Sequence, residues 1–167
     1  MFLYNPGMLD ELLEMWRTHE AVNLMLLGAV PDEALAAIPL LEGGKPGKGR
    51  DIARVYGHCI DVRMSMMRRA EVAAAGGFKG FDKGYTPSRE DIEEGLAASS
   101  AAVEMRVATA LEKGERIHKR GPHIFVAYLV CHESHHRGQV MLALKQNGFT
   151  MPDSVKWGMW SRWFEAD

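Results

Sequence analysis

The longest uninterrupted helical pattern in the chain runs from Pro122 to about Asn147. Residues spaced by three or four positions share one face of this helix, namely Phe125, Leu129, His132, His136, Val140 and Ala143. Because the other members of this face are apolar, we expect the two histidines to point into a core, where their ring nitrogens need partners. Two imidazoles one turn apart can reach the same metal ion. The pattern therefore predicts a long core helix that contributes two metal ligands.

Three further stretches show helical periodicity, and segments containing glycine or proline separate them. We expect these helices at residues 5–28, 50–75 and 86–113, with Ser88 and Asp91 in capping-box spacing at the start of the third. No segment shows the sustained alternation of a strand. The sequence therefore predicts an all-α fold, a four-helix bundle. A chain of 167 residues has the size of one domain, 1–167.

The stripe of the first helix is apolar apart from two residues, Glu20 and Asn23. Its other members are Leu9, Leu12, Leu13, Trp16, Leu24 and Leu27. The two polar residues lie either at the edge of the stripe, in water, or on the wall of a polar pocket.

Aromatic residues cluster near the C-terminus. Three tryptophans stand three residues apart and a phenylalanine follows the last of them, namely Trp157, Trp160, Trp163 and Phe164. This tail predicts a short aromatic helix, laid against the bundle or buried in a dimer contact.

The second helix adds a third inward histidine. Its inner face is expected to hold Val55, His58, Cys59, Val62, Met66 and Arg69. Alone, His58 would read as a hydrogen-bonded core residue, but beside His132 and His136 it can supply a third ligand. Three neutral imidazoles with an open position form the arrangement of a catalytic metal site. Imidazole suits zinc, nickel, iron and copper alike, so the ligand type does not select the ion.

Polar residues flank the two histidines of the fourth helix. Glu133 and Arg137 stand at i and i+4, the favourable order for an ion pair. They form either a structural pair or a pair that supports the ligands or faces a substrate. His135 is one step round the helix and is expected to face solvent or to support a ligand. Gln139 lies near the inner face and could hydrogen-bond a ligand histidine.

Two other motifs overlap the same residues. The run His132-Glu133-x-x-His136 satisfies the zinc-peptidase pattern, in which the glutamate activates water. The chain lacks the extension of that pattern and a strand to present a peptide, which disfavours a protease. Glu133-x-x-His136 with Glu115-x-x-His118 resembles the paired motif of di-iron bundles. Glu115 and His118 fall in a polar loop and matching inward glutamates are missing, so this alternative is disfavoured further.

Composition excludes several classes of partner. The formal net charge is −2, and basic residues are scattered among acidic ones, so we expect no nucleic-acid partner. No apolar stretch reaches membrane-spanning length and the N-terminus lacks signal-peptide features, so we expect no membrane association. The two cysteines, Cys59 and Cys131, make no disulfide framework and read as core residues. A reducing, cytoplasmic location fits this usage.

The chain resembles the DinB-like (DNA-damage-inducible) metalloproteins, which are related to YfiT-type metal-dependent hydrolases. The resemblance rests on Tyr56-Gly57-His58, on the run His132-Glu133-Ser134-His135-His136-Arg137-Gly138-Gln139, on the order of four helices and on the tryptophan-rich end. It implies a bundle of the DinB/YfiT type in which His58, His132 and His136 bind a divalent metal, zinc or nickel foremost, with iron as a further option. It also implies a homodimer.

Characterised members of the family that the chain resembles include thiol-dependent S-transferases and isomerases. The resemblance therefore implies a metal-dependent enzyme that directs a low-molecular-weight thiol onto a small-molecule electrophile. The pair Glu133 and Arg137, nominated from its spacing beside the histidines, supplies the candidate catalytic residues. A metal-dependent hydrolase is the alternative enzyme. A non-catalytic, stress-related metal-binding bundle is the alternative outside enzymes.

Overall fold

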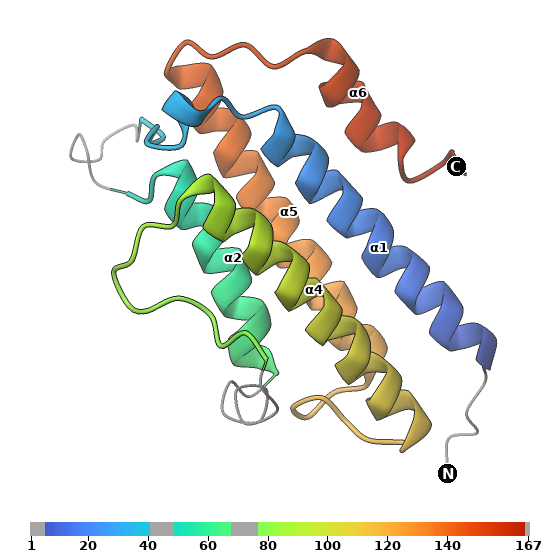
Figure 1. The fold of residues 1–167 in the computed structure, drawn as a ribbon. Helices are drawn as coiled ribbons and strands as arrows, with labels where there is room; N and C mark the ends of the chain where they lie inside the picture. The colour runs from blue at the N-terminus through green and yellow to red at the C-terminus, as the bar shows by residue number, and fades with distance from the viewer. Residues whose placement is uncertain (1–5, 41–48, 68–76, 166–167) are drawn as a thin grey trace.

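In the described part of the chain, four long helices lie side by side, and a short helix near the C-terminus packs against the first of them (Figure 1). A computed structural model describes residues 6–40, 49–67 and 77–165. The elements in chain order are α1 (Pro6–Gly28), the 3-10 turn η1 (Asp32–Ala34), α2 (Ile52–Met66), α4 (Arg89–Glu112), α5 (Pro122–Gln146) and α6 (Asp153–Ser161). The described ranges contain no strand, only an isolated bridge between Ile117 and Arg120. The predicted all-α class is confirmed.

The packing order of the helices is compatible with the predicted four-helix bundle. Both α4 and α5 pack against α1 and against α2, so α1 and α2 occupy opposite corners. The helix ends follow the local chemistry that the sequence carries. Ser88 caps α4, and Asp91 returns a bond to the backbone of Ser88, which completes the predicted capping box. Pro122 opens α5, and Gly148, at φ +81°, follows its end.

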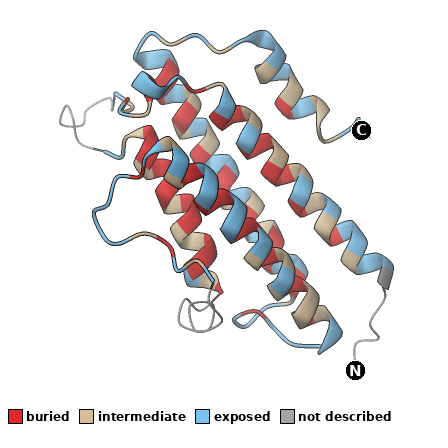
Figure 2. Cartoon of the chain, viewed as in Figure 1, coloured by how far each residue is buried: buried red, intermediate tan, exposed pale blue. Residues whose placement is uncertain are grey.

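Buried residues follow the sides of the helices that face one another (Figure 2). A buried polar layer divides this core into two apolar clusters. One cluster includes Trp16, Met64, Val103, Val107 and Leu129. The other includes Leu26, Ile60, Leu96, Val140 and Ala143. Between them along the helices lie the buried polar residues His19, Glu20, Asn23, Arg63, Ser99, Ser100, Glu133 and His136. Burying charged groups is costly unless they are paired, so we expect these residues to be paired with one another and to serve a structural or functional role.

The inner face of α2 differs from the prediction by about a quarter turn. Arg63 is fully buried and Met64 is buried with it, whereas Val62 and Met66 are only half-buried. The predicted inner face did not include Arg63, and arginine is seldom buried without a partner. Arg69 and the predicted end of this helix at Ala75 lie outside the described residues.

Three smaller predictions also need correction. Leu24 is 46% exposed, not part of the inner stripe of α1. Cys131 is exposed rather than in the core, whereas Cys59 is buried as predicted. The helix α6 does pack against α1, but through Met159, while Trp157 and Trp160 are about two-thirds exposed, at 69% and 67%. The dimer contact predicted for this tail stays a prediction. None of the described helices combines the length and the hydropathy needed to span a bilayer.

Candidate metal centre

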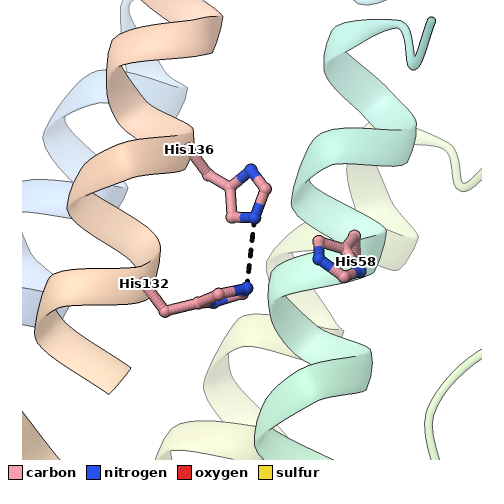
Figure 3. A group of neighbouring side chains, drawn as sticks. All are labelled: His58, His132 and His136. Atoms are coloured by element: carbon pink, nitrogen blue, oxygen red, sulfur yellow. Dashed lines mark hydrogen bonds between the residues drawn. The ribbon is translucent and has the colours of Figure 1, made fainter. Parts of the chain in front are cut away.

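Three histidines from two helices converge between α2 and α5 (Figure 3). His58 comes from α2, and His132 and His136 lie one turn apart on α5. One ring nitrogen of each lies within 4.8 Å of the corresponding nitrogens of the other two. The ring of His58 meets the other two edge-on, with centroids 5.2 Å from His132 and 4.8 Å from His136. The structure thus brings together the three residues that the sequence nominated as ligands.

The spacing and chemistry of these nitrogens fit a divalent metal ion. His132 Nε2 and His136 Nε2 are 3.1 Å apart. Two imidazole nitrogens on one tetrahedral zinc, each about 2.0–2.1 Å from it, would lie about 3.3 Å apart. His136 is buried, whereas His58 and His132 are partly exposed, so the cluster is reached from solvent. Imidazole nitrogens without a carboxylate suit zinc, nickel or iron rather than magnesium or calcium.

Gln139 fixes which nitrogen of His136 faces the centre of the cluster. Its side-chain oxygen lies 2.8 Å from His136 Nδ1, and its amide nitrogen lies 3.1 Å from His135 Nε2. The oxygen can only accept, so Nδ1 of His136 carries the proton and Nε2 presents its lone pair toward His132. The predicted hydrogen bond between Gln139 and a candidate ligand histidine is therefore present, with His136 as the donor. His135 is exposed and supports this contact from outside.

Replacing Gln139 with alanine is expected to lower zinc affinity by about 10–100-fold, the usual cost of losing a partner that orients a ligand histidine. Competition with a chromophoric chelator measures this change. Gln146→Ala is the matched control, because Gln146 lies on the same helix but bonds the backbone of Leu40. Equal affinities for the two variants would show that Gln139 does not orient a ligand.

All three imidazoles of the cluster are neutral near pH 7. Burial, with the nearby charge of Arg50, lowers the pKa of His58 to about 4. Burial also lowers the pKa of His132 and that of His136, and Arg50 contributes to both shifts. A metal ligand must be deprotonated, so the cluster offers three lone pairs at neutral pH without first losing protons.

Directly behind the cluster, Arg63 links three helices through two buried carboxylates. Its Nε and a terminal nitrogen donate to the two oxygens of Glu133, both at 2.7 Å. The terminal nitrogens also donate to the two oxygens of Glu20, at 3.1 and 2.5 Å. Ser99 Oγ and the Leu96 carbonyl, both on α4, accept further bonds at 3.1 and 3.4 Å. The helices α1, α4 and α5 therefore all supply hydrogen-bond acceptors to this guanidinium of α2.

Pairing outweighs burial for the charged groups of this layer. Burial alone would raise the pKa of the Glu133 carboxyl, but Arg63 and His19 hold it well below its usual range. Burial alone would lower the pKa of Arg63, but Glu133 and Glu20 raise it. Glu133 and Arg63 therefore stay charged at neutral pH, whereas burial lowers the pKa of His19.

Arg137 completes the layer on its far side. Its guanidinium donates to Asn23 Oδ1 at 2.6 Å and to His19 Nδ1 at 3.2 Å. Since Arg137 can only donate, His19 is the tautomer whose Nε2 donates to Glu133, at 2.9 Å. Asn23 also donates to Glu133, at 2.6 Å. Of the two alternatives for Glu20 and Asn23, the structure shows the polar interior and not a water-facing edge.

The predicted pair of Glu133 and Arg137 is indirect. Among the described residues, Glu133 pairs with Arg63, and Arg137 reaches it only through His19 and Asn23. Glu133 is 1% exposed, and the cavity that it lines with Tyr56 has a volume of about 10 Å³, room for about one water molecule. The carboxylate is thus held away from bulk solvent. The catalytic roles predicted for Glu133 and Arg137 stay predictions.

Sequence reasoning missed Arg63 and His19 as members of this layer. A signal for Arg63 exists, because it sits three residues after Ile60 and four before Met67, both buried. Glu115 and His118, the other half of the di-iron alternative, are both exposed on the loop before α5, and Glu115 pairs with Arg106 at 3.0 Å. The structure therefore does not bring them to the cluster.

Comparison with known proteins assigns the chain to a family. The sequence profile of the DinB superfamily matches residues 15–140, a span that contains the three histidines and the whole buried polar layer. Neither the curated proteins nor the solved structures compared with the chain give a match. The profile covers well over half of the chain, so the resemblance read from the histidine motifs is confirmed and the chain belongs to the DinB superfamily.

Proposed function

We propose that the chain is a metal-dependent S-transferase that joins a low-molecular-weight thiol to a small electrophile. The observation that carries the proposal is the convergence of His58, His132 and His136, with neutral imidazoles and a solvent-accessible side. A divalent metal held by these residues would lower the pKa of a thiol bound to it, so that the nucleophilic thiolate is present at neutral pH.

The reaction is a substitution at the electrophile. The thiol sulfur forms a bond to the electrophilic carbon, the bond from that carbon to its leaving group breaks, and the thiol proton passes to solvent. The chain itself holds the three nitrogens in place. Gln139 sets the tautomer of His136, and the buried layer around Arg63 ties α5 to α2. We propose that Glu133 and Arg137 act by positioning the histidines that flank them in sequence.

The position of Glu133 argues against peptidase chemistry. In that reaction the glutamate must reach and deprotonate water beside the metal. Here both carboxylate oxygens accept bonds from Arg63, and the pKa of the carboxyl lies below its usual range. A carboxylate that is buried and held in this way is a poor base with little access to substrate.

A conjugation assay tests the proposal. Untagged protein, reconstituted with zinc or nickel, is incubated with several low-molecular-weight thiols and 1-chloro-2,4-dinitrobenzene, and thioether formation is followed by absorbance. We expect conjugation above background that requires metal and is lost in His132→Ala. His123→Ala, which alters an exposed histidine of the same helix, is the control. Conjugation that is equal in metal-stripped and metal-loaded protein would count against the proposal.

A further inference from the structure

A pocket of about 260 Å³ opens beside His58. Its walls come from the start of α2 and from the loop before α4, and include Arg50, Arg54, His58, Phe81, Lys83 and Tyr85. The volume falls just below the range of about 300–1,000 Å³ that is usual for drug-sized ligands. The pocket therefore suits a small molecule, one end of which lies against a histidine of the candidate metal centre.

The loop wall of this pocket is fixed to α2. The backbone N–H of Phe81 donates to the Asp61 carboxylate at 2.9 Å. At Gly57, next to His58, a Cβ atom would lie 3.3 Å from Pro87 Cγ and 3.6 Å from the Phe81 ring, so the missing side chain lets the loop approach closely. The ring of Tyr85 lies beside that of Phe81, tilted by 31°, with centroids 5.6 Å apart. The pocket is thus a built feature with an aromatic wall.

Two cations of the pocket lack a partner in the described part of the chain. Arg54 is engaged, since it donates to the Gly49 carbonyl at 2.8 Å and lies 3.6 Å from the Asp51 carboxylate. By contrast, no described residue forms an ion pair or a side-chain hydrogen bond with Arg50 or Lys83. Arg50 and Lys83 approach the pocket from its two separate walls, the start of α2 and the loop.

Neither acidic residue of the lining, Asp61 or Asp82, forms an ion pair with Arg50 or Lys83. Asp61 accepts the bond that anchors the loop. Asp82 is exposed. The charge of Arg50 helps to lower the pKa of all three imidazoles of the candidate metal centre, so this cation lies near that centre.

We propose that this pocket binds a carboxylate-bearing small molecule, with the carboxylate held by Arg50 and Lys83 and the remainder of the molecule directed along His58 toward the three histidines. The inference rests on the proposed function and names the class of its substrate, an organic anion. Guanidinium and ammonium groups recognise carboxylates through charge-assisted hydrogen bonds, and the aromatic wall packs against the carbon skeleton.

A ligand pair that differs only in charge tests the pocket. Metal-stripped full-length protein is titrated with succinate and with succinamide, and the amide signals of Gly57, Gly84 and Tyr85 are followed by NMR. Loss of one or two charge-assisted hydrogen bonds should make succinamide bind at least about tenfold more weakly. The double substitution Arg50→Gln and Lys83→Gln should weaken succinate binding by at least about tenfold for the same reason. Lys79→Gln, on the same loop but outside the lining, should leave it unchanged.

Equal binding of the two ligands, or succinate binding that survives the double substitution, would overturn the inference. The titration needs no metal, so a failed conjugation assay leaves its result intact. Conversely, a protein that catalyses conjugation but does not bind succinate would overturn this inference and leave the proposed function intact. Repeating the titration on zinc-loaded protein with mercaptosuccinate shows which substrate carries the carboxylate. If mercaptosuccinate binds more tightly than succinate, the carboxylate belongs to the thiol substrate. If the two bind equally, the carboxylate belongs to the electrophile.

Discussion

Replacing Arg63 with methionine is expected to lower the free energy of unfolding by about 3–5 kcal/mol, the usual cost of removing one partner of a buried ion pair. The guanidinium is fully buried and donates hydrogen bonds to the carboxylates of Glu20 and Glu133, residues that are 8% and 1% exposed. Methionine fills similar space but leaves two buried carboxylates without their main counter-charge. Thermal unfolding should shift downward by roughly 6–20 °C for a chain of this size.

An exposed pair on two of the same helices provides the control for Arg63. Arg17 on α1 donates to both oxygens of Glu104 on α4, at 3.0 and 2.6 Å, in the same two-pronged geometry. Its side chain is 62% exposed, so Arg17→Met should cost no more than about 1 kcal/mol. Adding Glu20→Gln and Glu133→Gln to Arg63→Met should recover part of the loss, because it removes the unpaired charges. If Arg63→Met and Arg17→Met cost the same, the buried layer is not a stabilising centre.

The sequence predicted the apolar part of the fold well, for a simple reason. The spacing of apolar residues on α5, the capping box at Ser88 and the glycine at position 148 are local signals, and local chemistry sets where helices begin, end and face. The convergence of His58 with His132 and His136 could be nominated as well. All three lie on predicted inner faces, and polar residues on such faces need partners.

The charged layer could be predicted only in part. Arg63, Glu20 and Glu133 come from three helices, and of these only Glu20 was placed on an inner stripe, where the edge and the polar pocket stayed open as alternatives. Their burial depends on one another, because any one of them without the others would be too costly to bury. Local periodicity carries no information on such a mutual dependence. For the same reason, the predicted pair of Glu133 and Arg137 was assigned within one helix, whereas the structure pairs Glu133 across the bundle.

Replacing any one of the three clustered histidines with alanine is expected to lower zinc affinity by more than about 100-fold, the upper end of the cost of losing a supporting partner. The reason is geometric, because three nitrogens within 4.8 Å of one another would then become two. His123→Ala is the matched control, since His123 is an exposed histidine on α5 away from the cluster.

A second readout separates lost ligation from misfolding. A ligand that binds only the folded state at 100 times its dissociation constant adds about 2.7 kcal/mol of stability. Zinc should therefore raise the midpoint of thermal unfolding of the wild type and of His123→Ala, and should leave that of His58→Ala nearly unchanged. Circular dichroism of the variant without zinc shows whether its helices are intact. A folded His58→Ala protein that zinc stabilises as much as the wild type would remove His58 from the site.

The most direct test is the zinc content of untagged protein after loading and dialysis, compared between the wild type and His58→Ala. Convergence of three imidazoles from α2 and α5 on one ion predicts about one zinc per chain in the wild type and almost none in the variant. Equal zinc in both proteins, or none in either, would contradict it.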